Sequence, residues 1–351
     1  MALQHVGYRT GHFGKFLNVF NAASFAELPV GWSEFLAVGT GRQFPRGELS
    51  PYYGYSLVGI GDDGGYTMEP HDVDPADHST RVVTNHAVDY IMTTGDEPLY
   101  LHVGYPAPHS RSFRRPPVPL PRDENADVDL PRLAPSVNEV DVSDKPAFIA
   151  GGDIRNLQEI DRWRRAIARS LFGVDRGIDA ILRAQNERDP GLANTLVMFV
   201  SDNGRLHGEH RWAGKGIAYE EAINVPLLVH WAAAPAGNLS SMVANLDIAS
   251  TIAEVSGMSF DHAESISLFD GSRRSVVLEG LGAERAYCGV RTQTRKYVRY
   301  ASGEVEYYNL RRDPYELWNR PASRGARELH RLARSLCAPN LPPGWPRDLE
   351  Y

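Results

Sequence analysis

The segment Ser-Asp-Asn-Gly at residues 201–204 directly follows a continuous apolar run at residues 195–200. In open α/β sheets the carboxyl ends of the strands form the ligand crevice, so Asp202 and Asn203 are predicted to lie there. A carboxylate beside an amide supplies the hard oxygen ligands that Ca²⁺ and Mg²⁺ take. An Asn-Gly pair is also a good turn, and the segment by itself leaves both interpretations open.

Lys215 lies between two glycines shortly after this segment. A lysine on such an exposed backbone can present its point charge to a sulfate or phosphate oxygen. The alternative is a solvated loop lysine, which is the usual environment of this residue type.

The segment Pro-Ala-Pro-His ends at His109 and follows another apolar run, residues 99–103. Flanking prolines stiffen the backbone, so the imidazole could donate to an anionic oxygen or protonate a leaving group. A structural histidine with satisfied hydrogen bonds is the alternative. Lys15, which follows a glycine in residues 11–18, is a further basic residue of this kind.

Strand-like and helix-like patterns alternate around these residues. Helical spacing of apolar residues predicts helices over 79–93, from about 156 to 182, and over 246–255. Apolar runs predict strands at 99–103, 195–200 and 225–231, the second of them a central parallel strand covered on both faces. Residues 31–65 are interpreted as long loops with short edge strands. The alternation predicts an α/β fold with a parallel or mixed sheet sandwiched by helices.

The pattern changes after residue 280. Three short aromatic-rich runs at 285–290, 296–301 and 305–310, followed by helical spacing over 326–336, predict a small antiparallel C-terminal subdomain. We therefore expect an α/β domain over 1–280 and a subdomain with a tail over 281–351. The proline-rich and acidic stretch 114–146 is interpreted as a surface excursion that helps set specificity.

Composition excludes several classes of function. The 351 residues carry 37 Lys and Arg against 44 Asp and Glu, a net charge of −7 that is poorly suited to nucleic acid. Two cysteines are too few for a disulfide framework, and Cys288 is expected to be a small buried hydrophobe. We expect no membrane span. The first nine residues lack the pattern of a signal peptide, which leaves the localisation open.

Taken in order, these segments resemble the sulfatase family of the alkaline-phosphatase superfamily. The resemblance begins with Gly-Tyr-Arg-Thr-Gly at 7–11, Gly-Lys-Phe-Leu-Asn at 14–18 and Pro-Val-Gly-Trp at 29–32. It continues through the segments around His109, Asp202 and Lys215 to residues 306–316. The closest similarity is to the glucosamine-6-sulfatase and heparan-type extracellular sulfatase branch.

The resemblance implies hydrolysis of a small-molecule or glycan sulfate ester with a Ca²⁺ cofactor. Asp202 and Asn203 would be calcium ligands, and Lys215 would grip the sulfate. Lys15 would neutralise the surroundings of the nucleophile, and His109 would contact the sulfate ester. A histidine that the family often places two positions after Ser-Asp-Asn-Gly falls on Leu206 in this chain, so His207 is a further substrate-binding candidate.

The nucleophile of the family has no counterpart in this sequence. Sulfatases begin with a strand bearing paired aspartates, and then a C-x-P-S-R or S-x-P-S-R segment whose first residue becomes formylglycine. Both precede the segment that matches residues 7–11, and only Met1 to Val6 stand before that segment in this chain. Cys337 is followed by Ala-Pro-Asn rather than by the rest of the motif. We therefore expect an N-terminally truncated and inactive chain that keeps part of its metal ligands.

Two other functions stay open. A phosphodiesterase or phosphonate hydrolase of the same superfamily would differ mainly at the nucleophile. A non-catalytic binder of sulfated glycans would use Lys15, His109 and Lys215 as an anion site, although the net charge of −7 disfavours polyanions.

Overall fold

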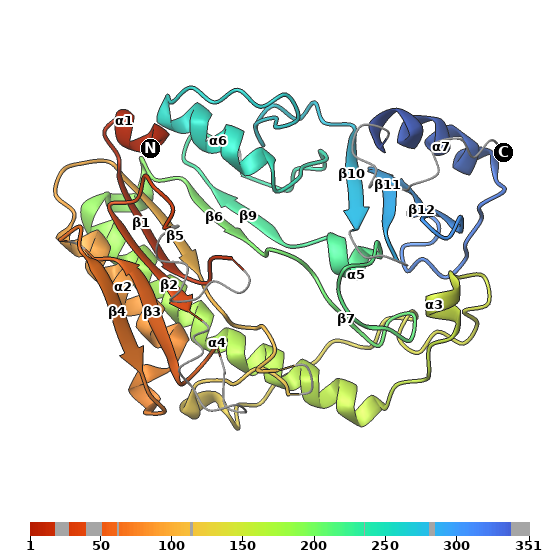
Figure 1. Ribbon diagram of the computed structural model, residues 1–351, viewed down its shortest axis with the longest axis horizontal. Helices are drawn as coiled ribbons and strands as arrows, with labels where there is room; N and C mark the ends of the chain where they lie inside the picture. Colours follow the sequence, from red (N-terminus) through yellow and green to blue (C-terminus); the bar gives the residue numbers. More distant parts are fainter. Residues whose placement is uncertain are drawn as a thin grey trace. The chain divides into compact units, whose positions relative to one another are not determined.

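The computed structural model describes residues 1–17, 28–39, 51–61, 63–112, 115–234, 236–280 and 285–337. The chain divides into two compact units (Figure 1). Unit 1 consists of residues 1–130, 161–195 and 256–259, and unit 2 of residues 131–160, 196–255 and 260–351. Every helix in the described part of the chain is too short or too polar to cross a lipid bilayer.

Unit 1 is built on a five-stranded mixed sheet. Its strands are β1 (Arg9–Gly14), β2 (Glu34–Gly39), β3 (Tyr55–Ile60), β4 (Tyr66–His71) and β5 (Leu99–Gly104), in the order β4-β3-β2-β1-β5. β1 is parallel to β2 and to β5, whereas β2, β3 and β4 are antiparallel. The short helix α1 (Ala2–His5) precedes β1. The mixed sheet with helices agrees with the predicted fold class.

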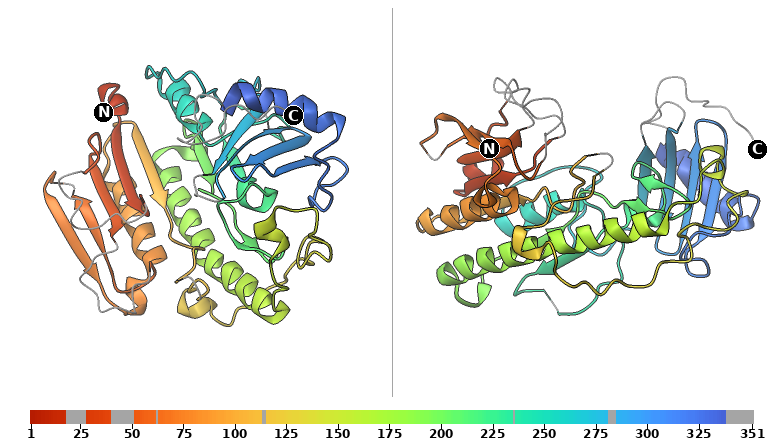
Figure 2. Two further views of the ribbon diagram at one scale, coloured as in Figure 1. Left: turned by 45° about the vertical axis from the view of Figure 1, so that its right-hand side comes forward. Right: turned by 90° about the horizontal axis from the view of Figure 1, so that it is seen from below.

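Two helices cover one face of this sheet. α2 (Ser79–Thr93) and the part of α4 (Leu157–Arg188) that belongs to unit 1 run along the same face (Figure 2, right). Val83 and Tyr90 of α2 pack against Phe13 and Leu57 of the sheet, and Ile181 of α4 joins them. Both helices lie where the apolar spacing predicted them. Single 3₁₀ turns occur at η2 (Pro75–Asp77), η3 (Pro121–Asp123) and η4 (Pro190–Leu192).

The prediction of loops and edge strands over residues 31–65 was wrong for β2 and β3, which lie inside the sheet. Their side chains are buried on both faces, as Phe35 and Leu57 illustrate. The glycines that suggested loops permit close strand packing instead. A Cβ atom on Gly59 would lie 1.6 Å from the carbonyl oxygen of Phe35, so no larger residue fits there.

Unit 2 contains two short ribbons and several short helices. β6 (Val197–Val200) pairs with β9 (Leu227–His230), and β7 (Leu206–His207) pairs with β8 (Ala213–Gly214). The helices are α3 (Ala147–Ala150), α5 (Glu220–Ile223) and α6 (Asp247–Ser256). β6 is the strand predicted at 195–200, but its described partner β9 is antiparallel to it. Phe199 and Val200 of β6 are exposed, so the strand is not covered on both faces as predicted. An apolar run favours a strand, and it carries no information about the direction of the partner.

The C-terminal part of unit 2 is a four-stranded antiparallel sheet with a helix on one face (Figure 2, left). The strands β10 (Ser275–Gly280), β11 (Tyr287–Thr292), β12 (Arg295–Tyr300) and β13 (Val305–Asn309) pair in sequence order. α7 (Arg324–Cys337) packs Ala326, Leu329 and Ala333 against β11 and β12. This is the predicted small antiparallel subdomain, and its first strand, β10, begins at Ser275.

Cys288 and Cys337 form a disulfide, with Cα atoms 6.0 Å apart. The bond joins the end of α7 to β11. The expectation that Cys288 is only a small buried hydrophobe was therefore wrong, although the residue is indeed buried. Two cysteines 49 positions apart give no sign of proximity until a helix folds back over a strand. The residues after Cys337 lie outside the described part of the chain.

The stretch from 115 to 146 is not a surface excursion throughout; Arg114 lies outside the described residues. Its second half contributes Ser136, Glu139 and Lys145, which are 0%, 5% and 5% exposed, to the interior of unit 2. Glu139 Oε1 lies 3.1 Å from Lys145 Nζ. A charged stretch can be buried when its charges pair, and a reading of composition does not detect such pairing.

Candidate functional site

Lys15 and His109 both follow parallel strands of unit 1. Lys15 comes directly after β1, and His109 comes five residues after β5, the neighbour of β1. The two strand ends approach closely, since the backbone N–H of Lys15 donates to the carbonyl of Gly104 at 2.6 Å. Gly14 has a φ of +113°, and a Cβ atom there would lie 2.1 Å from the same carbonyl oxygen. The carboxyl ends of adjacent strands therefore place both predicted residues at one edge of the sheet.

The His109 side chain is exposed and its backbone is fixed. Its N–H donates to the carbonyl of Pro106 at 2.8 Å, and its carbonyl accepts from the buried hydroxyl of Tyr52 at 2.5 Å. Nδ1 lies 2.9 Å from the carbonyl oxygen of Ser110, which can only accept, so Nδ1 carries the proton. This tautomer leaves Nε2 as the second functional atom of the ring.

Asn203 and Lys215 meet in unit 2. Asp202 and Asn203 follow β6, and Lys215 follows β8. The Lys215 ammonium donates to Asn203 Oδ1 at 2.7 Å. Gly214 and Gly216 have φ angles of +140° and +80°, a left-handed backbone that requires glycine on both sides of the lysine. The structure thus brings together two of the four unit 2 residues that the sequence singled out.

His207 lies on β7, where its backbone N–H donates to Glu209 Oε2 at 2.5 Å. Burial raises the pKa of Glu209, and the hydrogen bond from His207 acts in the opposite direction. Lys15 and His109 belong to unit 1, and Asp202, Asn203, His207 and Lys215 belong to unit 2. The functional roles of all six residues stay predictions.

The donor atoms of Asp202 and Asn203 suit a hard cation, because both side chains end in oxygen. Asn203 Nδ2 donates to the carbonyl of Gly204 at 2.9 Å, which fixes the amide so that Oδ1 faces Lys215. These two residues fit part of a calcium shell, which takes six to eight oxygens. A metal bound to them would share Asn203 Oδ1 with the lysine.

A second group of potential metal ligands was not predicted. One donor atom each of His210, Glu221 and Glu316 lies within 4.8 Å of the other two, and the three residues could hold a metal ion. His210 and Glu316 are 0% and 1% exposed. They come from the loop between β7 and β8, from α5 and from the turn after β13. His210 and Glu221 are 11 positions apart, but Glu316 lies 95 positions beyond Glu221, so only the tertiary structure reveals the group.

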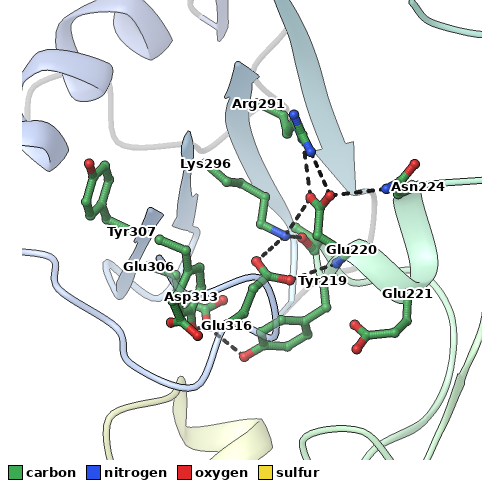
Figure 3. Close-up of polar contacts among 12 residues, drawn as sticks. Tyr219, Glu220, Glu221, Asn224, Arg291, Lys296, Glu306, Tyr307, Asp313 and Glu316 are labelled. Carbon is green, nitrogen blue, oxygen red and sulfur yellow. Dashed lines mark hydrogen bonds and ion pairs between the residues drawn. The ribbon is translucent and has the colours of Figure 1, made fainter. Parts of the chain in front are cut away.

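The carboxylates beside this group are paired with cations (Figure 3). Glu220 pairs with Arg291 at 2.8 Å and lies 3.5 Å from Lys296, whose ammonium also contacts Glu316. Glu316 Oε2 accepts from the backbone N–H of Glu220 at 2.8 Å. Burial raises the pKa of Glu316 to about 7, against the charge of Lys296.

Glu306 lies in a cage of three tyrosines. Its carboxylate accepts from the hydroxyls of Tyr219, Tyr300 and Tyr308 at 2.6, 2.5 and 2.5 Å. Burial first, and the charge of Glu306 second, raise the pKa of each of these tyrosines well above 10. The phenols therefore stay protonated donors, and their hydrogen bonds stabilise the carboxylate.

Several known sulfatases are similar to this chain in sequence. An arylsulfatase of Volvox carteri is 32% identical over 254 residues, which are 65% of this chain and 36% of that protein. The chain spans between 36% and 58% of the length of three arylsulfatase relatives. A relative described as an N-acetylglucosamine-6-O-sulfatase, from Bacteroides thetaiotaomicron, is 28% identical over 183 residues, 45% of this chain and 32% of that protein.

Solved structures show the same fold. A protein in complex with its substrate D-glucosamine-2-N,6-O-disulfate superposes with a TM-score of 0.73 at 19% identity, covering 96% of this chain and 81% of that one. The phosphonate monoester hydrolase of Agrobacterium radiobacter gives 0.69 at 18% identity, over 97% and 80% of the two chains. Members of the sulfatase family usually bind a metal. The sulfatase family model matches residues 1–258, and the chain therefore belongs to the sulfatase family.

Proposed function

We propose that this chain serves the hydrolysis of sulfate esters in the manner of sulfatases. The contact between Lys215 and Asn203 carries the proposal, because it joins a cation to a potential metal ligand directly after β6. A sulfate ester is a monoanion, and its charge builds up on oxygen as the S–O bond breaks. An exposed ammonium on a glycine-flanked loop can bind those oxygens and stabilise that charge.

Asp202 and Asn203 would hold Ca²⁺ as part of its oxygen shell. The ion would supply positive charge next to the sulfate group. Lys215, which donates to Asn203 Oδ1, would keep that amide oriented and add a second positive charge. His207, two residues from the half-buried Glu209, is proposed as a minor contact to the substrate.

Lys15 and His109 are proposed to act on the reacting ester. Lys15 would stabilise the negative charge of an attacking nucleophile, and His109 would donate from Nε2 to the ester oxygen. The proton on Nδ1 is held by the carbonyl of Ser110, so donation from Nε2 requires the imidazolium form. The exposure of the ring is consistent with such a proton exchanging with solvent.

The substrate is proposed to be a sulfated sugar. Two solved neighbours support this class by what they bind: one holds D-glucosamine-2-N,6-O-disulfate and another a neocarrahexaose. A phosphonate or phosphodiester substrate is the alternative that the likeness to the phosphonate monoester hydrolase supports at the level of fold. A non-catalytic binder of sulfated glycans would use the same cationic residues.

Replacing Lys215 by methionine should weaken binding of an aryl sulfate by about tenfold or more, since a hydrogen bond to a charged group contributes about 1.5–3 kcal/mol. Methionine keeps the length of the side chain and removes its charge. The 351 residues contain no C-x-P-S-R segment, so equilibrium binding rather than turnover is measured, by calorimetry at low ionic strength.

Arg183→Met is the matched control, because Arg183 is an exposed cation on α4 whose side chain is 77% accessible. Unchanged affinity in Lys215→Met would refute the role of the lysine. Competition separates the substrates: sulfate should displace the aryl sulfate, whereas stronger displacement by methylphosphonate would favour the phosphonate alternative.

A further inference from the structure

Two buried donor atoms of unit 2, His210 Nε2 and Glu221 Oε2, make no hydrogen bond to any described residue. Each has less than 1 Å² of accessible surface, as has Glu316 Oε1, which contacts the Lys296 ammonium. These are side chains of the group whose donors lie within 4.8 Å of one another. Each of the three side chains is also held by a further hydrogen bond, which fixes its position. Buried polar atoms are rarely left without a hydrogen-bond partner.

The contacts of His210 suit a metal ligand. Its Nδ1 lies 2.6 Å from Glu139 Oε2, and Glu139 is paired with Lys145 at 3.1 Å. A carboxylate can only accept, so Nδ1 carries the proton. The ring also stacks on Tyr219, with centroids 3.9 Å apart. A carboxylate that accepts from one imidazole nitrogen and orients the other is the usual arrangement behind a metal-bound histidine.

Both carboxylates are also fixed. Glu221 Oε1 accepts from the hydroxyl of Ser136 at 3.1 Å, and Glu316 Oε2 accepts from the backbone N–H of Glu220 at 2.8 Å. Glu316 Oε1 makes an ion pair with Lys296, and a carboxylate oxygen has a second lone pair available for another partner.

The carboxylates around His210 outnumber the cations that pair with them. Lys145 balances Glu139, Arg291 balances Glu220, and Lys296 balances Glu316. Glu221 has no cationic partner among the ion pairs of the described residues, and Glu306 is stabilised by tyrosine hydroxyls alone. A divalent cation between His210, Glu221 and Glu316 would offset this excess of negative charge and give His210 Nε2 and Glu221 Oε2 a partner.

We propose that His210, Glu221 and Glu316 form a structural site for a divalent transition-metal ion of the zinc type. One imidazole nitrogen with two carboxylate oxygens suits such an ion, whereas Ca²⁺ takes six to eight oxygens. The site shares no residue with Asp202 and Asn203, so it is independent of the proposed calcium ligands. The ion would join the loop after β7 and helix α5 to the turn after β13, which lies 95 positions further along the chain at Glu316.

The test uses the full chain freed of metal with a chelator and then titrated with Zn²⁺ alone. We expect one equivalent of tightly bound zinc, measured by elemental analysis after dialysis, and a higher melting temperature. Glu221→Gln should weaken zinc binding at least tenfold, because it replaces a ligand oxygen charge by a neutral amide of the same shape. Glu187→Gln, at an exposed position of α4, should leave it unchanged.

Two further measurements keep the outcome decisive. Co²⁺ in place of zinc should give visible absorption bands typical of low coordination number, and Glu221→Gln should lose them. Asp202→Asn should retain the zinc equivalent; its loss there, with retention in Glu221→Gln, would overturn the proposal. Absence of zinc binding in the wild-type chain would also overturn it.

Discussion

Reduction of the disulfide between Cys288 and Cys337 should lower the free energy of unfolding of unit 2 by up to about 4 kcal/mol. The bond closes a loop of 49 positions, and the loss of loop-closure entropy in the unfolded chain gives this magnitude for a loop of that length. The folded contacts of α7 with β11 and β12 are unchanged by reduction, so the effect acts mainly on the unfolded state.

Chemical denaturation in the presence and absence of a thiol reductant measures this effect. Because the chain has two units, hydrogen exchange of peptides from β11 and α7 should accompany the global signal. A Cys288→Ala, Cys337→Ala double variant is the control and should not respond to reductant. Detection of two free thiols in the untreated, denatured chain would contradict the disulfide itself.

Acidification should destabilise unit 1 through His12. In the unfolded chain this residue takes a proton near its ordinary pKa of 6.5. In the folded protein, burial first and the charge of His102 second lower the pKa of His12 to about 3. Between these pH values the unfolded state binds more protons, so stability is complete above pH 6.5 and is lost as the pH falls. At 1.36 kcal/mol per unit, the loss reaches roughly 4 to 5 kcal/mol at most.

The surroundings of His12 explain why this residue resists protonation in the folded protein. His12 is 0% exposed, and its Nδ1 lies 2.7 Å from Nδ1 of His102 on the adjacent strand β5. One of these nitrogens must offer a lone pair to the other, so protonating both would oppose two N–H groups. The ring of His12 also stacks on Phe35, with centroids 4.7 Å apart, which contributes to the burial of His12.

Hydrogen exchange of the β1 amides between pH 7 and pH 4 tests this prediction. Protection should fall with pH in the wild-type chain after correction for intrinsic exchange rates. His12→Asn should flatten the dependence, because the asparagine amide replaces Nδ1 and does not titrate. His5→Gln, at an exposed position of α1, serves as the control. An equal pH dependence in the wild-type chain and in His12→Asn would rule out His12 as the cause.

The sequence predicted elements best where the spacing of apolar residues was regular. α2 and α4 lie where residues recurred every three or four positions, because a helix with one apolar stripe can bury it in only one way. β2 and β3 were missed as interior strands, since Gly59 and neighbouring tyrosines suggested loops. A glycine that permits close strand packing and a glycine that makes a turn are identical in sequence.

The structure brings some of the predicted site residues together, and their roles stay predictions. Proximity of Lys215 to Asn203 followed from two segments that the sequence already grouped, only 12 positions apart. Lys15 and His109 reach one sheet edge because both follow parallel strands. Charged residues of the 131–146 stretch were assigned to the surface, and Glu139 was found buried behind His210.

By itself, the sequence determined the family and the α/β alternation, and it singled out the residues that are proposed to bind an anion or a hard cation. Those features depend on residues close together in the sequence, and a short motif or the spacing of apolar residues reveals them. Tertiary structure alone decided the disulfide, the tyrosine cage around Glu306 and the convergence of His210, Glu221 and Glu316. Each of these joins segments far apart in sequence, and the energy that selects them arises only when burial removes water and forces charges and donors to find partners.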